Sequence, residues 1–464
     1  MTSNDTICAL ATAPGGALGI IRVSGPQSLE ILSHVFRGKG NVQSFQPNTI
    51  HYGHIVDYGA MSQHHLPIDE VMVSIFRAPH SYTGEDSVEI SCHGSRYILN
   101  KAIELLIQNG CRMAKPGEYT QRAFLNGKMD LSQAEAVADL IASSNKATHQ
   151  MAIRQLRGQF SSELSRLRQQ LLKLTSLLEL ELDFSDHEDL EFANRSELVS
   201  TAKNIYIRVT ALAHSFETGQ ALKNGVPVAI VGKTNVGKST LLNALLKDDR
   251  AIVSDIHGTT RDTIEDTIDI QGVTFRFIDT AGIRQTNDEV EMIGIRRTYS
   301  TIEKAQIILW IFDTNPTREE IEEIIEQTKH KSLIIIKNKI DIVLQRNECL
   351  PPVSEVENIP IIEISAKQGI NVDKLEQAIF ESANISQLSE QDIIVSSARQ
   401  YQSLVRAHEN LSRVLSGLES GLSADLVSED LRLVLDDLAD ITGQGRIVPN
   451  EVLGNIFKNF CVGK

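Results

Sequence analysis

Cysteine is scarce in this sequence, and the few cysteines form no recognisable pattern. The chain has five of them in 464 residues, and no pair has the CxxC spacing. They are Cys8, Cys92, Cys111, Cys349 and Cys461. An odd number of widely separated cysteines argues against a disulfide framework, and the lack of CxxC argues against a structural zinc site. This usage fits a protein of a reducing compartment.

Long hydrophobic runs and an excess of positive charge are absent as well. No segment approaches the roughly 18 consecutive apolar residues of a membrane span, and the opening MTSNDTICALATAPGG lacks the basic and apolar regions of a signal peptide. We therefore predict a cytoplasmic protein with no membrane span. The 60 acidic residues outnumber the 45 basic ones and give a net charge of −15, so the whole molecule is no electrostatic clamp for nucleic acid. Contact with RNA would need a local basic patch or a basic partner.

The length and the hydrophobic content indicate several domains. At roughly 150 residues per domain, 464 residues correspond to about three, and 41% hydrophobic residues suffice for their cores. Residues 1–120 combine apolar strands at 18–23, 71–76 and 87–92 with Gly/Pro turns and a helix near 97–108. This mixture predicts an α+β domain.

The pattern changes to helical periodicity over residues 121–218. The sequence SQAE, from Ser132 to Glu135, predicts a capping box that opens a helix, and apolar residues then recur at spacings of four and three. These residues are Phe160, Leu164, Leu167, Leu171, Leu174 and Leu178. We expect this stripe to pack against neighbouring helices, with a partner-binding face as the alternative.

Helical periodicity returns in residues 386–464, after an interruption. One helical face there carries Tyr401, Leu404, Leu411, Leu415 and Leu418. A single helical domain interrupted by an insert is the economical interpretation, and two separate helical domains are the alternative. The apolar runs of the insert, residues 219–385, predict a mostly parallel sheet covered on both faces. They are residues 226–231, 273–278, 306–312, 333–337 and 361–364.

Five motifs occur in a fixed order inside the insert. They are GKTNVGKS (232–239), GTTRD (258–262), DTAG (279–282), NKID (338–341) and SAK (365–367). The first fits G-x-x-x-x-G-K-[ST] between a strand and a helix, so its backbone N–H groups are expected to surround phosphate. In NKID the Asp341 carboxylate can accept from ring N1–H and from the exocyclic amine of guanine, a pair of donors that adenine lacks. The motifs together predict a Ras-like α/β P-loop GTPase domain.

The motifs also name the residues expected at the nucleotide. Those expected to bind GTP are Asn235, Val236, Gly237, Lys238, Ser239, Thr240, Ser254, Asp255, Ile256, His257, Gly258, Thr259, Thr260, Asp279, Thr280, Ala281, Gly282, Asn338, Lys339, Ile340, Asp341, Ser365, Ala366 and Lys367. Ser239 and Thr260 are the natural Mg²⁺ ligands, and Lys238 supplies fixed positive charge for phosphoryl transfer. The side-chain carbonyl of Asn235 can ligate a monovalent cation or can merely suit a tight turn, and the spacing leaves both readings open.

One residue of the usual hydrolytic machinery is missing. Ile283 stands where Ras-type enzymes keep a glutamine that orients the attacking water, and isoleucine has neither a donor nor an acceptor. Another group must do this work, and the candidates downstream are Asp288, Glu289 and Glu291. Arg261 and Arg284 are candidate arginine fingers, although surface or structural roles are commoner for each.

Beyond the motifs, the chain resembles the bacterial and organellar tRNA-modification GTPase family known as MnmE or TrmE. The matching segments are NDTICALAT and IIRVSG, SYTGEDSVEISCHG (81–94), PGEYTQRAFLNGKMDLSQAEAVADLI (116–141), DEVEMIGIRR and a terminal CVGK. The resemblance implies a homodimer of chains with three domains. These are an N-terminal folate-binding and dimerisation domain (1–120), a helical domain (121–218 and 386–464, with the CVGK tail) and a G domain (219–385).

The resemblance further implies a reaction and a partner. Together with MnmG (GidA), a flavoprotein, in a heterotetramer or larger complex, the family adds a carboxymethylaminomethyl or aminomethyl group at C5 of wobble uridine 34 in certain tRNAs. By match to the family, the K⁺ site is Asn235, Ser254, Ile256 and Thr259. Glu291 matches the proposed water-orienting acid, and Arg261 matches an arginine of the mobile switch. The positions for 5-formyl-tetrahydrofolate or methylene-tetrahydrofolate are Arg22, Glu85, Lys128 and Lys464, with Cys461 as a candidate tail thiol.

Two other functions are weighed against this one. A ribosome-assembly GTPase carries the same motifs but predicts an RNA-binding module after the G domain, where this chain is helical and acidic. A non-enzymatic scaffold with a degenerate nucleotide site is opposed by the intact Lys238, Ser239, Thr260 and Asp279.

Overall fold

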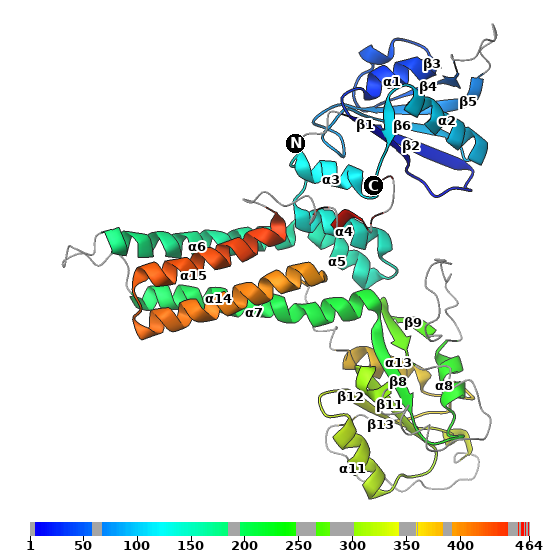
Figure 1. Cartoon of the computed structure of the whole chain (residues 1–464). Helices are drawn as coiled ribbons and strands as arrows, with labels where there is room; N and C mark the ends of the chain where they lie inside the picture. The colour runs from blue at the N-terminus through cyan, green and yellow to red at the C-terminus, as the bar shows by residue number, and fades with distance from the viewer. Residues whose placement is uncertain are drawn as a thin grey trace. The chain divides into compact units, whose positions relative to one another are not determined.

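The structure is a computed structural model of the chain (Figure 1). It describes residues 5–57, 67–183, 195–246, 266–278, 301–342, 359, 361–383, 392–443, 453, 456–458, 460 and 463. The chain forms two compact units. The first consists of Met1–Ile141, Arg154–Ile205 and Arg406–Lys464, and the second of Ala142–Ile153 and Tyr206–Val405.

The first unit begins with a seven-stranded sheet. Its strands are β1 (Thr6–Leu10), β2 (Leu18–Ser24), β3 (Phe36–Gly38), β4 (Thr49–Val56), β5 (Pro67–Phe76), β6 (Ser87–His93) and β7 (Cys111–Met113). Their spatial order is β3-β4-β5-β6-β2-β1-β7, and all neighbours are antiparallel except β1 and β7. In β5, Val71, Val73 and Ile75 are buried while Glu70 and Met72 are exposed, so one face of the sheet faces a core.

Helices cover that face. They are α1 (Ser28–Val35) and α2 (Arg96–Gln108), and the short η1 (Val42–Ser44) and α3 (Glu118–Leu125) complete this part. Leu32 and Leu106 of the two longer helices belong to the same buried cluster as Val73 of the sheet. The predicted α+β fold is thereby confirmed, with β2, β5, β6 and α2 at the predicted positions.

The helical part of the chain contains long helices from both sides of the insert. These are α4 (Leu131–Ala142), α5 (Lys146–Leu156), α6 (Gln159–Asp183), α7 (Arg195–Asn224), α14 (Ala398–Ser420) and α15 (Ala424–Thr442). Helices α6 and α15 pack side by side (Figure 1), and Arg432 Nη2 donates to Glu179 Oε1 at 2.9 Å between them. Segments from both sides of the insert therefore pack against each other. No described helix combines the length and the apolar character that crossing a bilayer demands.

The apolar stripe of α6 is a packing face. All six predicted residues, from Phe160 to Leu178, are buried. In α14, Leu404, Leu411 and Leu418 are buried as predicted, whereas Tyr401 and Leu415 are only half-buried.

The predicted capping box at SQAE was wrong by two residues. Asp130 Oδ1 accepts from the Gln133 N–H at 2.9 Å, and Gln133 Oε1 accepts from the Asp130 N–H at 2.9 Å. The reciprocal pair is thus made by DLSQ. Ser132 lies inside the helix and is buried, where its Oγ accepts from Gln155 Nε2 at 3.1 Å.

The second unit contains a six-stranded sheet. Its strands are β8 (Val226–Val231), β9 (Asp266–Ile270), β10 (Val273–Phe277), β11 (Ile307–Phe312), β12 (Ser332–Lys337) and β13 (Ile361–Glu363), in the order β13-β12-β11-β8-β10-β9. Only β9 and β10 are antiparallel neighbours. The helices described in this part are α8 (Lys238–Leu245), α11 (Arg318–Gln327) and α13 (Val372–Ser382).

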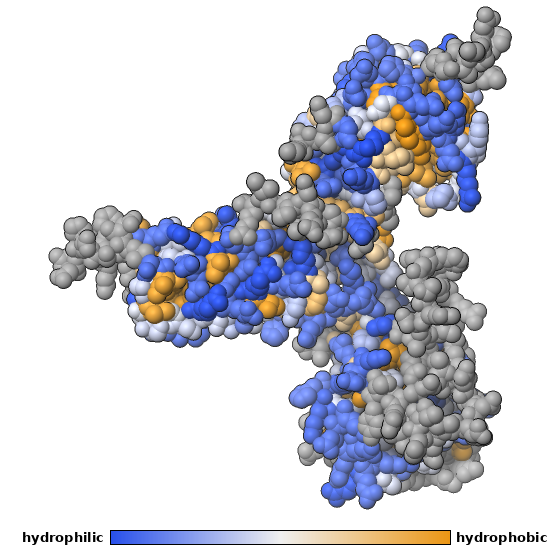
Figure 2. All heavy atoms as spheres, viewed as in Figure 1, coloured by the Kyte–Doolittle hydropathy of each residue, from blue (hydrophilic) through white to orange (hydrophobic). Residues whose placement is uncertain are grey.

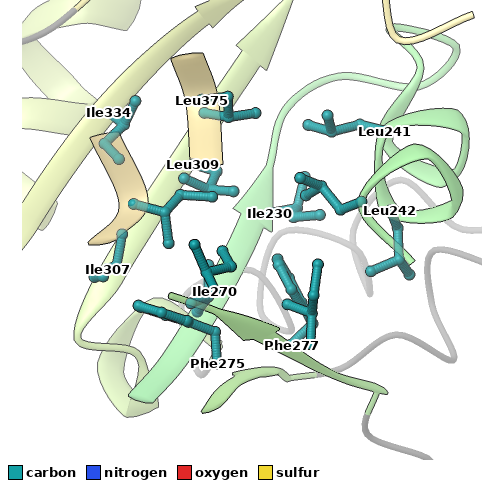
Figure 3. Packing of buried hydrophobic residues seen from close by; sticks show 14 of the residues in the cluster. Ile230, Leu241, Leu242, Ile270, Phe275, Phe277, Ile307, Leu309, Ile334 and Leu375 are labelled. Atoms are coloured by element: carbon teal, nitrogen blue, oxygen red, sulfur yellow. The ribbon is translucent and has the colours of Figure 1, made fainter. Parts of the chain in front are cut away.

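Strand β11 shows why both faces of this sheet are covered. Ile307, Leu309 and Ile311 point into one buried cluster, which Figure 3 shows together with residues of α8 and α13. The alternate residues Ile308 and Trp310 belong to a second cluster with Ile324 of α11. Burial of the whole strand confirms the predicted mostly parallel sheet between helical layers.

Candidate functional site

The loop between β8 and α8 has a backbone that only particular residues allow. Gly232 has φ +155° and Gly237 has φ +100°, and a Cβ atom on either would overlap the carbonyl oxygen of Ile311 or the Asn338 side chain. Asn235 has φ +62°, in the left-handed region that asparagine adopts more readily than most residues. Glycine at both positions therefore lets the loop pack closely against β11 and Asn338, and a glycine-rich loop of this kind can surround phosphate with main-chain N–H groups.

Lys238 is the first residue of α8 and folds back over the loop. Its Nζ donates to the carbonyl oxygens of Gly232 at 2.6 Å and Lys233 at 2.7 Å. Burial lowers the pKa of Lys238. The amine is therefore held above the loop, beside the unpaired N–H groups of the helix N-terminus, where an anion can replace the two carbonyls as its partner.

The NKID and SAK segments brace this loop from the side. Asn338 is buried; its Nδ2 donates to Val236 O at 2.8 Å, and its Oδ1 accepts from Ala366 N at 3.0 Å. Ser365 Oγ donates to Asp341 Oδ1 at 2.7 Å, which fixes the carboxylate expected to select guanine. One buried asparagine thus joins three loops.

The remaining GTP-site predictions fall partly outside the described residues. Residues 254–261, 279–284 and 288–291 lie there, and they include Thr260, Arg261 and Glu291. Of the expected Mg²⁺ and K⁺ ligands, the structure describes Ser239 and Asn235. The Asn235 side chain is exposed and has no hydrogen-bond partner among the described residues, so its oxygen is available to a cation.

A second site lies at the end of β2 in the first unit. The Arg22 guanidinium donates to Glu89 Oε1 at 2.9 and 2.7 Å and lies over the rings of Tyr82 and Tyr119, 5.6 and 5.7 Å from their centroids. Its Nη1 also donates to Gly463 O at 3.2 Å. Arg22 is therefore oriented by a carboxylate, by two aromatic faces and by the carboxyl-terminal tail.

Glu85 is joined to the same place through Ser24. Ser24 lies two residues after Arg22 on β2, and its Oγ donates to Glu85 Oε2 at 2.8 Å. Arg122 Nη1 donates to both carboxylate oxygens of Glu85 at 3.3 and 3.2 Å. The Glu85 side chain is still 18% exposed, so its carboxylate can also accept donors from a ligand.

Lys128 and the tail complete the predicted set. Lys128 is exposed, its Nζ donates to Pro79 O at 2.8 Å, and its stem lies beside Gly84. Lys464 and Cys461 lie outside the described residues, but Gly463 is buried against Leu10 with φ +100°. Gly463 is therefore docked beside Arg22, and the structure brings Arg22, Glu85 and Lys128 to one region.

Sequence reasoning missed the partly buried ion network that surrounds Arg122. Arg122, 5% exposed, bonds Asp5 Oδ1 at 2.7 Å and Glu118 Oε1 at 3.1 Å in addition to Glu85. Arg112 bridges Asp5 and Glu118 from the other side, at 2.7 and 2.6 Å. The only sequence signal was the i,i+4 spacing of Glu118 and Arg122 on one helix, which does not reveal partners more than 100 residues away.

No group of three or more His, Cys, Asp or Glu side chains with metal-binding geometry occurs in the described part of the chain. Cys8, Cys92 and Cys111 are buried free thiols. Burial raises the pKa of Cys92 to about 11, which makes this thiol a poor nucleophile.

Known proteins match the chain from end to end. The model of the MnmE helical domain matches residues 131–461, and that of the GTP-binding protein TrmE N-terminus matches residues 6–128. The tRNA modification GTPases MnmE of Phocaeicola vulgatus and Bacteroides fragilis are 53% and 52% identical, each over 100% of both chains. The MnmE of Flavobacterium johnsoniae is 49% identical over the same shares. With the phosphate loop and its braces in place, these matches mean that the chain belongs to the MnmE family of tRNA modification GTPases.

Proposed function

We propose that K⁺ stimulates GTP hydrolysis by this chain and that, with MnmG, hydrolysis serves the addition of a carboxymethylaminomethyl or aminomethyl group at C5 of wobble uridine 34 in certain tRNAs. The observation that supports the cation most directly is Asn235. Its main chain is fixed in the phosphate loop while its side-chain amide has no partner among the described residues. A bound K⁺ would add positive charge at the transferring phosphate, which an arginine finger supplies in related enzymes. The full-length match to MnmE relatives favours this function over a ribosome-assembly GTPase.

The proposed roles divide among three groups of residues. Mg²⁺ is held by Ser239 and Thr260, and K⁺ by the side chain of Asn235 with Ser254, Ile256 and Thr259. Lys238 neutralises charge on the transferring phosphate, Glu291 orients the attacking water, and Arg261 acts from the GTTRD segment. Each of these steps is electrostatic positioning, which is what phosphoryl transfer chiefly requires.

The Arg22 region is proposed to bind 5-formyl- or methylene-tetrahydrofolate. Glu85 offers a carboxylate to the adjacent N–H donors of a pterin, whereas Arg22, Lys128 and Lys464 offer cations to the carboxylates of the folate tail. Cys461 lies two residues before the docked Gly463 in the sequence, so its thiol is proposed to reach the same site.

A homodimer and a three-domain division are part of the proposal. Apolar side chains on the open face of the N-terminal sheet, or at its rim, are well exposed: Leu18, Ile50, Tyr52 and Met72 are 68, 62, 59 and 52% accessible. Figure 2 shows apolar surface on this part of the molecule, where Figure 1 draws β2, β6 and α2. An exposed apolar area of this kind suits a second copy of the chain. The proposed domains are residues 1–120, 121–218 with 386–464, and 219–385, in a cytoplasmic protein that contacts MnmG and tRNA.

The cation is tested by comparing GTP hydrolysis in K⁺ and in Na⁺ for the wild type, Asn235→Ala and Asn235→Gly. Glycine keeps the left-handed backbone and removes only the side chain, so both variants should lose most of the stimulation while Asn235→Gly keeps its GTP affinity. Equal rates in the two salts for the wild type would end the proposal.

Folate is tested by calorimetry with 5-formyl-tetrahydrofolate. Glu85→Ala should weaken binding strongly. Glu70→Ala, an exposed glutamate on the same sheet, serves as the matched control and should bind like the wild type. Mass spectrometry of wobble uridine from cells that carry only the variant then reports the modification itself.

A further inference from the structure

Lys339 makes a second contact that its motif does not explain. Its Nζ donates to Asn235 O at 2.8 Å and to Asp313 Oδ2 at 2.7 Å. Asp313 directly follows β11, and Lys339 comes two residues after the end of the neighbouring β12. Because these parallel strands pair Phe312 with Lys337, their carboxyl ends bring the two side chains to one edge of the sheet.

The ammonium group of Lys339 is therefore held by Asp313 on one side and holds the Asn235 carbonyl on the other. The Asp313 side chain is 28% exposed and that of Lys339 is 36% exposed. Water therefore screens the attraction between the two charges less than it would for a fully exposed pair. Asn235, at φ +62°, has its carbonyl oxygen held by the same ammonium group. Fixing this carbonyl fixes the peptide plane after Asn235 and hence the direction in which the Asn235 side chain leaves the loop.

We infer that Asp313 is a positioning residue that acts through Lys339 to hold Asn235 in the conformation that receives a monovalent cation. The inference rests on the proposed cation role of Asn235. It adds that the guanine-recognition motif and the cation site share one support, since Lys339 belongs to NKID. Loss of the Asp313 carboxylate should therefore lower the affinity for the cation and leave the rate of the chemical step with bound cation nearly unchanged.

The test is a K⁺ titration of GTP hydrolysis at saturating GTP. Asp313→Asn keeps the size of the side chain and removes its charge, so the K⁺ concentration for half-maximal activity should rise about threefold to tenfold, with kcat at saturating K⁺ close to the wild type. This range corresponds to the net contribution of one ordinary hydrogen bond, because the introduced asparagine side chain can still accept from Lys339 without the charge. Asp313→Glu restores the carboxylate and should recover part of the K⁺ affinity.

The matched control is Glu320→Gln. Glu320 also pairs with a lysine of the phosphate loop, Lys233, at 2.5 Å, but that lysine does not hold Asn235. Glutamine can still serve the capping box with Thr317, so α11 should keep its N-terminus. The control removes one negative charge near the loop but keeps the contacts from Asp313 through Lys339 to Asn235.

Each outcome decides the matter. A rise in half-maximal K⁺ for Asp313→Asn alone supports the inference. An unchanged value, or an equal rise for Glu320→Gln, overturns it, because the effect is then absent or due to general charge. Should Asp313→Asn lose its thermal unfolding transition, the same titration of Asp313→Ser, which also removes the carboxylate, decides, and a wild-type value there overturns the inference. If Asn235→Gly keeps full K⁺ stimulation, the proposed cation site itself has failed.

Discussion

The nucleotide site and the Arg22 site are held together by different kinds of contact. Around the phosphate loop, the lysine and asparagine side chains mostly hold carbonyl oxygens: those of Gly232, Lys233, Asn235 and Val236. Around Arg22, side chains hold other side chains, through Glu89, Glu85 and Arg122. The first site is thus specified by backbone conformation and the second by paired charges.

This difference predicts how each site fails. A main-chain cradle tolerates changes in side-chain chemistry but not an added Cβ, whereas a buried ion network tolerates small shifts but not the loss of one charge. The two sites also lie in different compact units, so one can fail while the other remains intact.

The largest effect is expected for Arg122→Met. It removes the cation that pairs with Glu85, whereas Asp5 and Glu118 keep Arg112, and it should lower the free energy of unfolding of the first unit by about 3 kcal/mol. Trp310, the single tryptophan, lies in the second unit, so the far-UV circular dichroism transition in urea should shift while tryptophan fluorescence stays.

Arg166→Met is the control for this comparison. Its ion pair with Glu163 lies on one turn of α6, with the Arg166 side chain 54% exposed, and should contribute less than about 1 kcal/mol. Equal shifts for the two variants would mean that the buried network contributes no more than a surface pair.

The next effect is expected for Gly463→Ala. The methyl group would overlap Leu10 O, and φ +100° is a strained conformation for alanine, so the tail should leave Arg22. Wobble-uridine modification should fall at least about tenfold, as for a loss of some 1.4 kcal/mol, while GTP hydrolysis is unchanged. Gly421→Ala, at φ +76° in open space, separates backbone strain from this overlap and should modify tRNA normally.

Ser365→Ala tests whether the nucleotide site can be weakened without an effect on the Arg22 site. It removes the hydrogen bond to Asp341 and should weaken GTP binding about fivefold, the equivalent of about 1 kcal/mol, with no change in folate binding. Ser332→Ala, whose hydroxyl bonds Ser382 O at the other end of the sheet, should leave GTP affinity unchanged in a fluorescent-nucleotide titration. A loss of folate binding in Ser365→Ala would contradict the independence of the two sites.

The smallest effect concerns acid stability. Burial raises the pKa of Glu118, but hydrogen bonds from Arg112, from the Lys115 N–H and from Arg122 outweigh it, so the pKa lies below its ordinary value. Its stabilising contribution is therefore present above the unfolded value of about 4.3 and is lost as pH falls through the lower folded value. The free energy of unfolding, measured by urea titration with circular dichroism, should fall as the pH is lowered below about 4.3. Glu118→Gln should reduce that pH dependence.

The sequence predicted the fold better than the Arg22 site, for a physical reason. Apolar period and glycine spacing are local, so β8, the α6 stripe and the phosphate loop followed from neighbouring residues. The cap of α4 was misplaced because DLSQ and SQAE overlap and both satisfy the capping pattern. Arg122 and Asp5 are 117 residues apart, and no local pattern encodes that pairing.

The hydrogen bond from Arg22 to Gly463 has a consequence for the time at which the first unit is completed. The two residues are 441 positions apart, so at roughly 5–20 residues per second the tail leaves the ribosome about 20–90 seconds after Arg22. During this interval the N-terminal sheet can pair all its strands, and Arg22 can already meet Glu89. The Arg22 site is therefore one of the last parts of the molecule to form during synthesis, after the GTPase domain has emerged.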